Sequence, residues 1–349
     1  MRTTFAATHA LVNANRVQMM KLQAELATAQ KELATGRLAD VGLGLGGQTG
    51  QVISLRQEYS RLEAITHTNS IVAARLEATQ ASVDLIAAGA EAFLAALIDG
   101  SRTEVAAKGL PAIAKSAMEA LVAALNSTHA GDYLFAGINT DVRPVADYFA
   151  SPASAAKQAV DDSFVANFGF AQGAPAAGAI AAADMSQFLD AGFASLFEPA
   201  GWTSAWSSAS NENIRSRISP SELVSTGTNA NSDGIRKLAM AYTMVVEFSA
   251  ANLSDAAFQV VAEKAVGLIG SAAADLTAER AQLGAAQERV SNASNRMSIQ
   301  MGVLANHVNA LEAVDPYEAS TRISTLMTQI ETAYALTARI QKLSILNYV

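Results

Sequence analysis

The residues with the clearest potential for chemistry form a glycine-rich run near the N-terminus. The run GLGLGG at residues 42–47 fits the spacing G-x-G-x-x-G, and with Gln48 and Thr49 it nearly fits G-x-x-x-x-G-K-[ST]. Both patterns bind phosphate where a strand precedes the loop and a helix follows it. Here a helical pattern precedes the run, and Gln48 stands where the phosphate-binding lysine belongs. We therefore interpret the run as a flexible hinge and not as a nucleotide site.

The histidines are too scattered to form a metal or catalytic site. The chain has four, His9, His67, His129 and His307, and none falls between residues 139 and 232. Zinc peptidase chemistry needs two histidines one helical turn apart, and no H-E-x-x-H pair exists. The chain also lacks cysteine, which excludes thiolate ligands and disulfides. We predict no metal ion, and we interpret each histidine as a solvated or seam residue.

Serine and aspartate are abundant, but their surroundings do not indicate an active site. No segment fits G-x-S-x-G, and a nucleophile in residues 139–232 would lack a histidine or cysteine beside it. Asp161 and Asp162 are interpreted as an exposed helix-surface pair. Five central aromatic residues are interpreted as a hydrophobic core, because aromatic rings bury the most area per residue: Phe188, Phe193, Phe197, Trp202 and Trp206. The sequence thus predicts no catalytic residue, no cofactor and no enzyme activity.

Composition narrows the class of partner. Of the 349 residues 50% are hydrophobic but only 6% are aromatic, and alanine, the strongest helix former, supplies much of the difference. The formal net charge of −8 argues against nucleic acid or an anionic membrane as a partner. No continuous apolar run reaches the roughly 18 residues that cross a bilayer. Residues 1–30 carry polar side chains throughout, unlike a conventional signal peptide.

The N-terminal segment carries a seven-residue repeat that predicts a helix with one apolar face. The apolar residues of the repeat are Phe5, Val12, Met19, Leu26 and Leu33. The alternate seam positions are Thr8, Asn15, Leu22 and Ala29. Such a face must meet a partner helix, and the small or polar alternate positions predict a seam that is weak alone. Gly36 is a candidate cap that ends this helix.

A longer repeat lies in the C-terminal part of the chain. Seven apolar residues follow one another at a spacing of seven, and they predict one helix over 262–314: Ile269, Leu276, Leu283, Val290, Met297, Leu304 and Leu311. Asp315 and Pro316 interrupt it, because proline disfavours helix in the residue before it. The last segment is again amphipathic. Leu326, Ile330 and Ile340 share one face, with Leu343 beside it.

These elements predict a palindromic chain. Residues 1–40 and 317–349 are terminal helical arms, residues 41–138 and 233–316 are a helical core, and Pro111 begins a helix within it. Residues 139–232 are a small α+β insert in the middle, with a strand, turn and strand at 214–226. The predicted fold class is mainly α, an elongated antiparallel coiled-coil bundle built from both chain termini. The apolar stripes of the two arms indicate an assembly seam.

Three segments resemble the flagellin superfamily. They are QAELATAQKELATGRLADVG at residues 23–42, NSTHAGDYLFAGINT at 126–140, and the stretch from VDPYEAS to the ending LSILNYV at 314–349. Within the superfamily, YLFAG at 133–137 and the ending LSILNYV are similar to the flagellin-like hook-associated proteins of the hook-filament junction. The resemblance covers residues 1–140 and 233–349, and the insert between them matches nothing in that family.

The resemblance implies a structural subunit of the bacterial flagellum that joins the hook to the flagellin filament. Such a subunit is extracellular and is exported by the flagellar type III system without a cleaved signal peptide. Its implied partners are other copies of itself in a ring, the hook-side hook-associated protein, and flagellin. A cytoplasmic export chaperone would bind the C-terminal arm, and both arms would line the inner tube as a coiled coil.

Three alternatives stay open. A filament flagellin has the same plan and would differ in its number of copies per flagellum. A secreted adhesin or enzyme on a flagellin-like scaffold is disfavoured as an enzyme by the missing histidine and cysteine in residues 139–232. An intracellular signalling coiled coil is disfavoured by the large insert and by the lack of a predicted membrane span.

Overall fold

The structure is a computed structural model that describes residues 3–100, 107–249 and 252–346. Within these ranges the side chains of residues 3–9, 11, 12 and 340–346 are outside the description. The chain divides into two compact units. Residues 1–63 and 298–349 form unit 1, and residues 64–297 form unit 2. The two divisions, after residues 63 and 297, fall inside the helices α3 (Thr49–Gly100) and α10 (Asp255–Glu312). They do not test the predicted domain boundaries, which stay a prediction.

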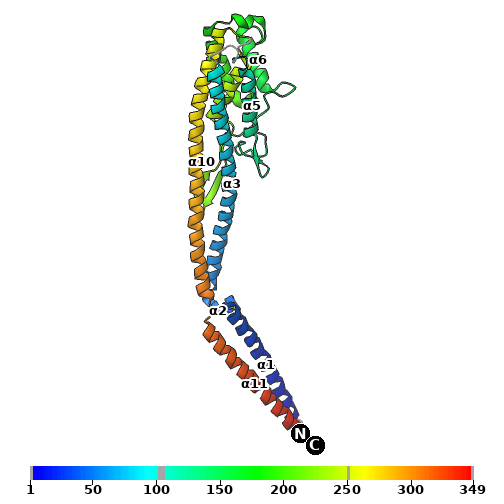
Figure 1. The fold of residues 1–349 in the computed structure, drawn as a ribbon. Coiled ribbons are helices and arrows are strands. Elements are labelled where there is room, and N and C mark those ends of the chain that lie inside the picture. Colours follow the sequence, from blue (N-terminus) through cyan, green and yellow to red (C-terminus); the bar gives the residue numbers. More distant parts are fainter. Residues whose placement is uncertain (1–2, 101–106, 250–251, 347–349) are drawn as a thin grey trace. The chain divides into compact units, whose positions relative to one another are not determined.

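Unit 1 contains the two terminal helices, which lie side by side and run in opposite directions (Figure 1). They are α1 (Thr3–Thr35) and α11 (Pro316–Leu346). Between α1 and α3 the chain forms the short helix α2 (Val41–Leu45) and the turn η1 (Gly46–Gln48). α11 begins at Pro316, one residue before the predicted start of the arm at residue 317, because proline fixes the backbone angle that the first turn of a helix needs.

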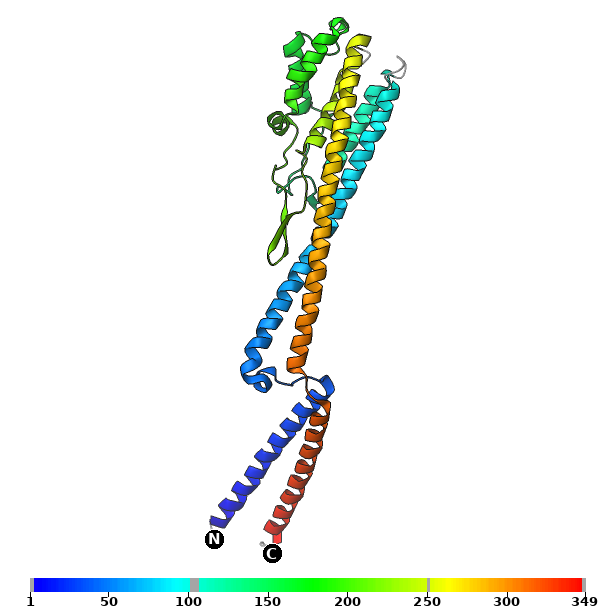
Figure 2. The same cartoon turned by 90° about the vertical axis from the view of Figure 1, so that its left-hand side faces the viewer.

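Unit 2 is built on α3 and α10, which run antiparallel beside each other (Figures 1 and 2). Its helices α5 (Leu110–Leu125) and α9 (Asp233–Glu247) pack against each other. The long repeat of α10 faces this core. Its first five residues are buried, namely Ile269, Leu276, Leu283, Val290 and Met297, while Leu304 and Leu311, which belong to unit 1, are half-buried. The spacing of seven thus identified the buried face of α10 correctly.

The insert region of unit 2 consists of short elements around an aromatic core. Its α-helices are α6 (Ala155–Phe168), α7 (Ala182–Phe188) and α8 (Pro199–Ala205). Between them lie the short 3-10 helices η2 (Pro175–Ala179) and η4 (Ala194–Leu196) and the single π-helical turn η3 (Leu189–Phe193). All five predicted core aromatics are buried. The rings of Trp202 and Trp206 stack with centroids 5.2 Å apart, and Tyr148 stacks on Trp206 at 5.1 Å. The interpretation as a hydrophobic core is confirmed.

Two small hairpins complete unit 2. β1 (Thr128–His129) pairs with β2 (Asp132–Tyr133), and β3 (Arg215–Ser219) pairs with β4 (Glu222–Ser225), both antiparallel. The second hairpin confirms the predicted strand, turn and strand. The predicted mainly α architecture, with long helices from both chain ends and a small strand-containing middle region, is also confirmed.

Two expectations need correction. The glycine-rich run, which we interpreted as a flexible hinge, is helical: Asp40 caps α2 by accepting the Leu43 amide at 2.9 Å, and the chain stays helical through η1 into α3. The expectation that no segment is apolar enough to cross a membrane also needs correction when hydropathy is averaged over 18 residues. The helical stretches Val41–Gly100 and Asp255–Glu312 contain windows of mean hydropathy 1.8 and 1.2, which by length and composition could cross a membrane. Core helices of soluble proteins pass the same test, so these windows do not by themselves indicate a span.

The YLFAG segment at residues 133–137 owes its sequence to packing. Leu134, Phe135 and Ala136 are buried. Gly137 has a φ of +65°, and a Cβ atom there would lie 2.6 Å from the carbonyl oxygens of Ser210 and Glu212. A side chain at this position is therefore disfavoured for two reasons, the backbone conformation and the lack of space. The segment ties the end of the helical core to the insert.

We expect Gly137→Ala to lower the free energy of unfolding of unit 2 by roughly 2 to 4 kcal/mol, from backbone strain plus the clash. Chemical denaturation followed by tryptophan fluorescence measures it. Gly131→Ala is the matched control, because Gly131 also has a positive φ, +96°, but open space around it. That control is expected to cost about 1 kcal/mol. Equal losses for the two variants would show that the close approach to residues 210 and 212 contributes nothing.

Candidate assembly surface

The seam between α1 and α11 is a thin apolar contact. Leu22 and Ala29 of α1 and Leu326 of α11 are buried there, and the residues packed around them are Leu26, Ile323 and Ile330. At about 3.6 residues per turn, residues three, four and seven apart share one helix face. Leu326 and Ile330 therefore meet the α1 stripe across the seam. A contact of this size holds the two arms together, but it buries so little apolar area that the loss of one buried side chain would weaken it strongly.

The structure places the predicted seam residues in different environments. Leu326 is buried, while Met19, Leu26 and Ile330 are half-buried. Leu33 is 41% exposed in the single chain. Among the described apolar side chains of α1, the buried ones are Leu22 and Ala29, which the repeat marked only as alternate positions. The side chains of Phe5, Val12, Ile340 and Leu343 lie outside the described residues. Their role in assembly stays a prediction.

The links at the inner ends of the arms are joined to each other. Residues 36–40 follow α1 and residues 313–315 precede α11, and Arg37 and Ala313 form an antiparallel bridge between them. The Leu38 amide donates to the Glu312 carbonyl at 2.9 Å, and the Val314 amide donates to the Gly36 carbonyl at 3.1 Å. We call this junction the clasp. It connects the start of one arm to the end of the other within unit 1.

Two buried carboxylates hold the clasp. The Glu312 side chain is 1% exposed and lies 2.6 Å from Arg56 of α3. Glu32, also buried, accepts the Ala39 amide at 3.2 Å and lies 3.5 Å from Arg322 of α11. The sequence analysis missed both. A signal existed, since each glutamate lies in the last turn of its helix, where the helix dipole disfavours negative charge unless a cation compensates it.

Each arm also has apolar surface that the seam does not cover. Val17 and Met20 of α1 are 57% and 53% exposed. By helical geometry they lie on the side of α1 opposite Leu22. On α11, Met327 and Tyr334 are 49% and 51% exposed and are seven residues apart on one face. The Tyr334 hydroxyl accepts a hydrogen bond from Gln23 of α1 at 3.1 Å, so this exposed face borders the seam. In a single chain these faces contact water, so burial against further helices would stabilise them.

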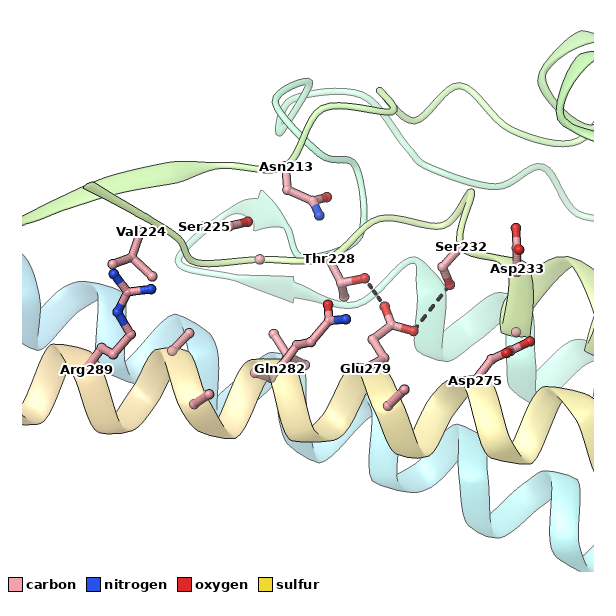
Figure 3. A pocket seen from close by; sticks show the side chains of 16 residues that line it. Asn213, Val224, Ser225, Thr228, Ser232, Asp233, Asp275, Glu279, Gln282 and Arg289 are labelled. Carbon is pink, nitrogen blue, oxygen red and sulfur yellow. Dashed lines mark hydrogen bonds between the residues drawn. The ribbon is translucent and has the colours of Figure 1, made fainter. Parts of the chain in front are cut away.

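The cavities of the described chain do not indicate catalysis. The cavity between α10 and the segment after β4 has a volume of about 500 Å³ (Figure 3), and its lining contains serine, threonine and carboxylates but no histidine. Within the described residues no group of three His, Cys, Asp or Glu side chains could hold a metal. Asp161 is ion-paired with Lys157, and Asp162 is exposed.

Comparison with known proteins decides the family. The model of the bacterial flagellin N-terminal helical region matches residues 7–140, and that of the C-terminal helical region matches residues 266–349. Together they cover more than half of the chain. The chain belongs to the flagellin family. No curated protein matches this flagellin-family chain.

The solved structures add the fold. A protein from Vibrio parahaemolyticus assigned as a flagellar hook-associated protein superposes with a TM-score of 0.52 at 10% sequence identity. The match covers 76% of this flagellin-family chain and 97% of that chain. The two family matches include nearly all of α1 and the whole of α11, and thus the seam, the clasp and the outward apolar faces. The chain is a structural subunit of the bacterial flagellum.

Proposed function

We propose that this flagellin-family chain is the adaptor that joins the flagellar hook to the flagellin filament, and that it is not an enzyme. The observation that carries its assembly role is the arm pair, in which α1 and α11 bury one seam and expose a second apolar face on each helix. The adaptor role within the family is supported by YLFAG at 133–137 and by the ending LSILNYV. The hook-associated protein of similar fold is consistent with it.

The mechanism of such an adaptor is assembly. Exposed apolar surface, such as that of Val17, Met20 and Tyr334, becomes buried when neighbouring subunits meet, at about 25 cal/mol per Å². Both arms would take part in assembly, because the seam and the clasp hold α1 and α11 together with their exposed apolar faces side by side. Copies of the chain would form a ring, with the hook-side hook-associated protein below and flagellin above.

The route to the flagellum belongs to the same proposal. The subunit would leave the cell through the flagellar type III system without a cleaved signal peptide. A cytoplasmic chaperone would cover the C-terminal arm beforehand. The sparse seam of α11 suits such a partner, because its exposed apolar residues, including Met327 and Tyr334, would otherwise promote premature association.

A strain that lacks this chain distinguishes the adaptor from a filament flagellin. We expect electron microscopy to show complete hooks without filaments, and the growth medium to contain secreted flagellin. Re-expression of the chain is expected to restore attached filaments, with a small fixed number of copies per flagellum. Loss of the filament protein itself, with this chain present along the whole filament of the parent strain, would instead identify a filament flagellin.

A further inference from the structure

One carboxylate fastens the segment that leads out of the insert to the long helix α10. Glu279 of α10 accepts hydrogen bonds from the Thr228 hydroxyl and, at 3.3 Å, from the Ser232 hydroxyl (Figure 3). Both donors belong to residues 227–232, which connect β4 to α9. The carboxylate forms part of the wall of the cavity of about 500 Å³, so water can reach this contact from one side.

No cation compensates this carboxylate among the residues that the structure describes. The lysine and arginine side chains of α9 and of the neighbouring part of α10 are paired with other carboxylates. On α9, Lys237 is paired with Asp275 and Arg236 with Asp233. On α10, Arg289 is paired with Glu222 of β4, and Arg280 with Asp84 of α3. Asp275, one turn before Glu279 on α10, adds a negative charge nearby. Ionised Glu279 is therefore poorly stabilised.

Burial has the expected electrostatic consequence. It raises the pKa of Glu279 from its ordinary value of 4.5 to about 7, and the charge of Asp275 acts in the same direction. The hydrogen bond from Ser232 opposes both effects by stabilising the ionised form. The carboxyl group thus changes its charge near neutral pH while it holds the segment.

We propose that Glu279 is a proton-sensitive latch that keeps residues 227–232 attached to α10 when protonated and releases them when ionised. The closed arrangement binds the proton more tightly than an open, hydrated one, so low pH favours closure. As pH rises from about 5 to about 7, the ratio of open to closed chains increases up to tenfold per pH unit, on the order of a hundredfold in all. Above that window both arrangements carry the charge, and the ratio levels off.

The latch controls contacts of the insert. The Ala230 amide donates to the Phe135 carbonyl at 2.8 Å, and the Trp202 indole donates to Asn231 at 3.0 Å. Ala230 and Trp202 are fully buried. Release of the segment exposes the Ala230 amide and removes the partner of the Trp202 indole. The base of the insert would therefore loosen as the pH rises towards neutral, while α3 and α10 stay packed.

Hydrogen exchange of the full chain tests the latch. After correction for the intrinsic pH dependence of exchange, we expect the opening of peptides that contain Ala230 to increase at least tenfold between pH 5.5 and pH 7.5. Glu279→Gln, which keeps the shape without the charge, is expected to make that opening independent of pH. Glu288→Gln removes a charge from an exposed position on the same helix and should behave like the unmodified chain.

A second variant keeps the test decisive if Glu279→Gln does not fold. Ser232→Ala removes the hydrogen bond that stabilises the ionised form, so the window of opening is expected to move to higher pH. Opening that does not depend on pH in the unmodified chain would overturn the proposal. So would a pH dependence that survives Glu279→Gln, or a window that Ser232→Ala leaves in place.

Discussion

Leu326→Asp is expected to abolish attachment of the subunit to the hook while leaving unit 2 folded. Leu326 is the buried α11 residue of the arm seam, beside Leu22 and Ala29 of α1. A carboxylate without a partner in an apolar contact costs on the order of 3 to 5 kcal/mol. The seam contains few other buried side chains, so we expect the two arms to separate. Neither could then present its outward face to a neighbouring subunit.

Three measurements check this prediction. The thermal midpoint of the free chain, followed by tryptophan fluorescence, should stay near the unmodified value, because Trp202 and Trp206 belong to unit 2. Hydrogen exchange in residues 13–35 and 316–339 should rise strongly. In cells that make only the variant, filaments should be lost from the hooks and flagellin should accumulate in the medium.

Thr328→Asp is the control for Leu326→Asp. Thr328 is exposed two residues further along α11, and it lies off the buried face. The same charge there should leave the arms paired and the filaments attached. If Leu326→Asp supported normal filaments, the arm seam would not be needed for assembly. If it lowered the midpoint of unit 2 by many degrees, the two units would not be independent in stability.

Arg56→Ala is expected to open the clasp, with the second largest effect. The Glu312 side chain is 1% exposed, and Arg56, 55% exposed, is the cation 2.6 Å from it. Removing Arg56 leaves a buried carboxylate without a partner. Because the arginine is partly hydrated, we expect a loss of roughly 2 to 4 kcal/mol, less than for a fully buried pair. The loss should appear as faster hydrogen exchange at the Leu38 and Val314 amides, whose bonds bridge the two links.

A double variant separates the charge from the general effect of truncation. Arg56→Ala combined with Glu312→Gln removes the unpaired charge and should recover at least half of the lost protection. Arg61→Ala is the matched control on the same helix, because Arg61 and its partner Glu58 are both exposed and such pairs contribute at most about 1 kcal/mol. Equal exchange in Arg56→Ala and Arg61→Ala would contradict a role of this ion pair in the clasp.

The clasp and the seam support each other within unit 1. The seam is thin, and Leu22, Ala29 and Leu326 alone bury little area. The clasp shortens the chain that the seam must close, since the arms already meet at their inner ends through Gly36 and Val314. Closing a shorter loop costs less conformational entropy. A thin seam can therefore hold the two arms together.

The sequence by itself determined the long-range plan of this protein. The repeat of seven identified the buried face of α10, because a helix returns to nearly the same side every seven residues. Pro111 marked a helix start, since proline lacks the amide that the first turn does not use, and Pro316 marked the break between α10 and α11. The insert hairpin followed from its alternating pattern between turn residues.

The tertiary structure alone decided which residues on each helix became buried, polar ones included. The periodicity of α1 did not distinguish the more buried Leu22 and Ala29 from Leu33, because burial depends on where α11 lies and not on spacing within one helix. The sequence did not identify the partners of Glu312 and Glu279. Their environments differ because residues distant in sequence meet them, Arg56 with a charge in one case and Thr228 with a hydroxyl in the other. The free energy of a buried carboxylate depends on such partners, and spacing along a single chain does not encode them.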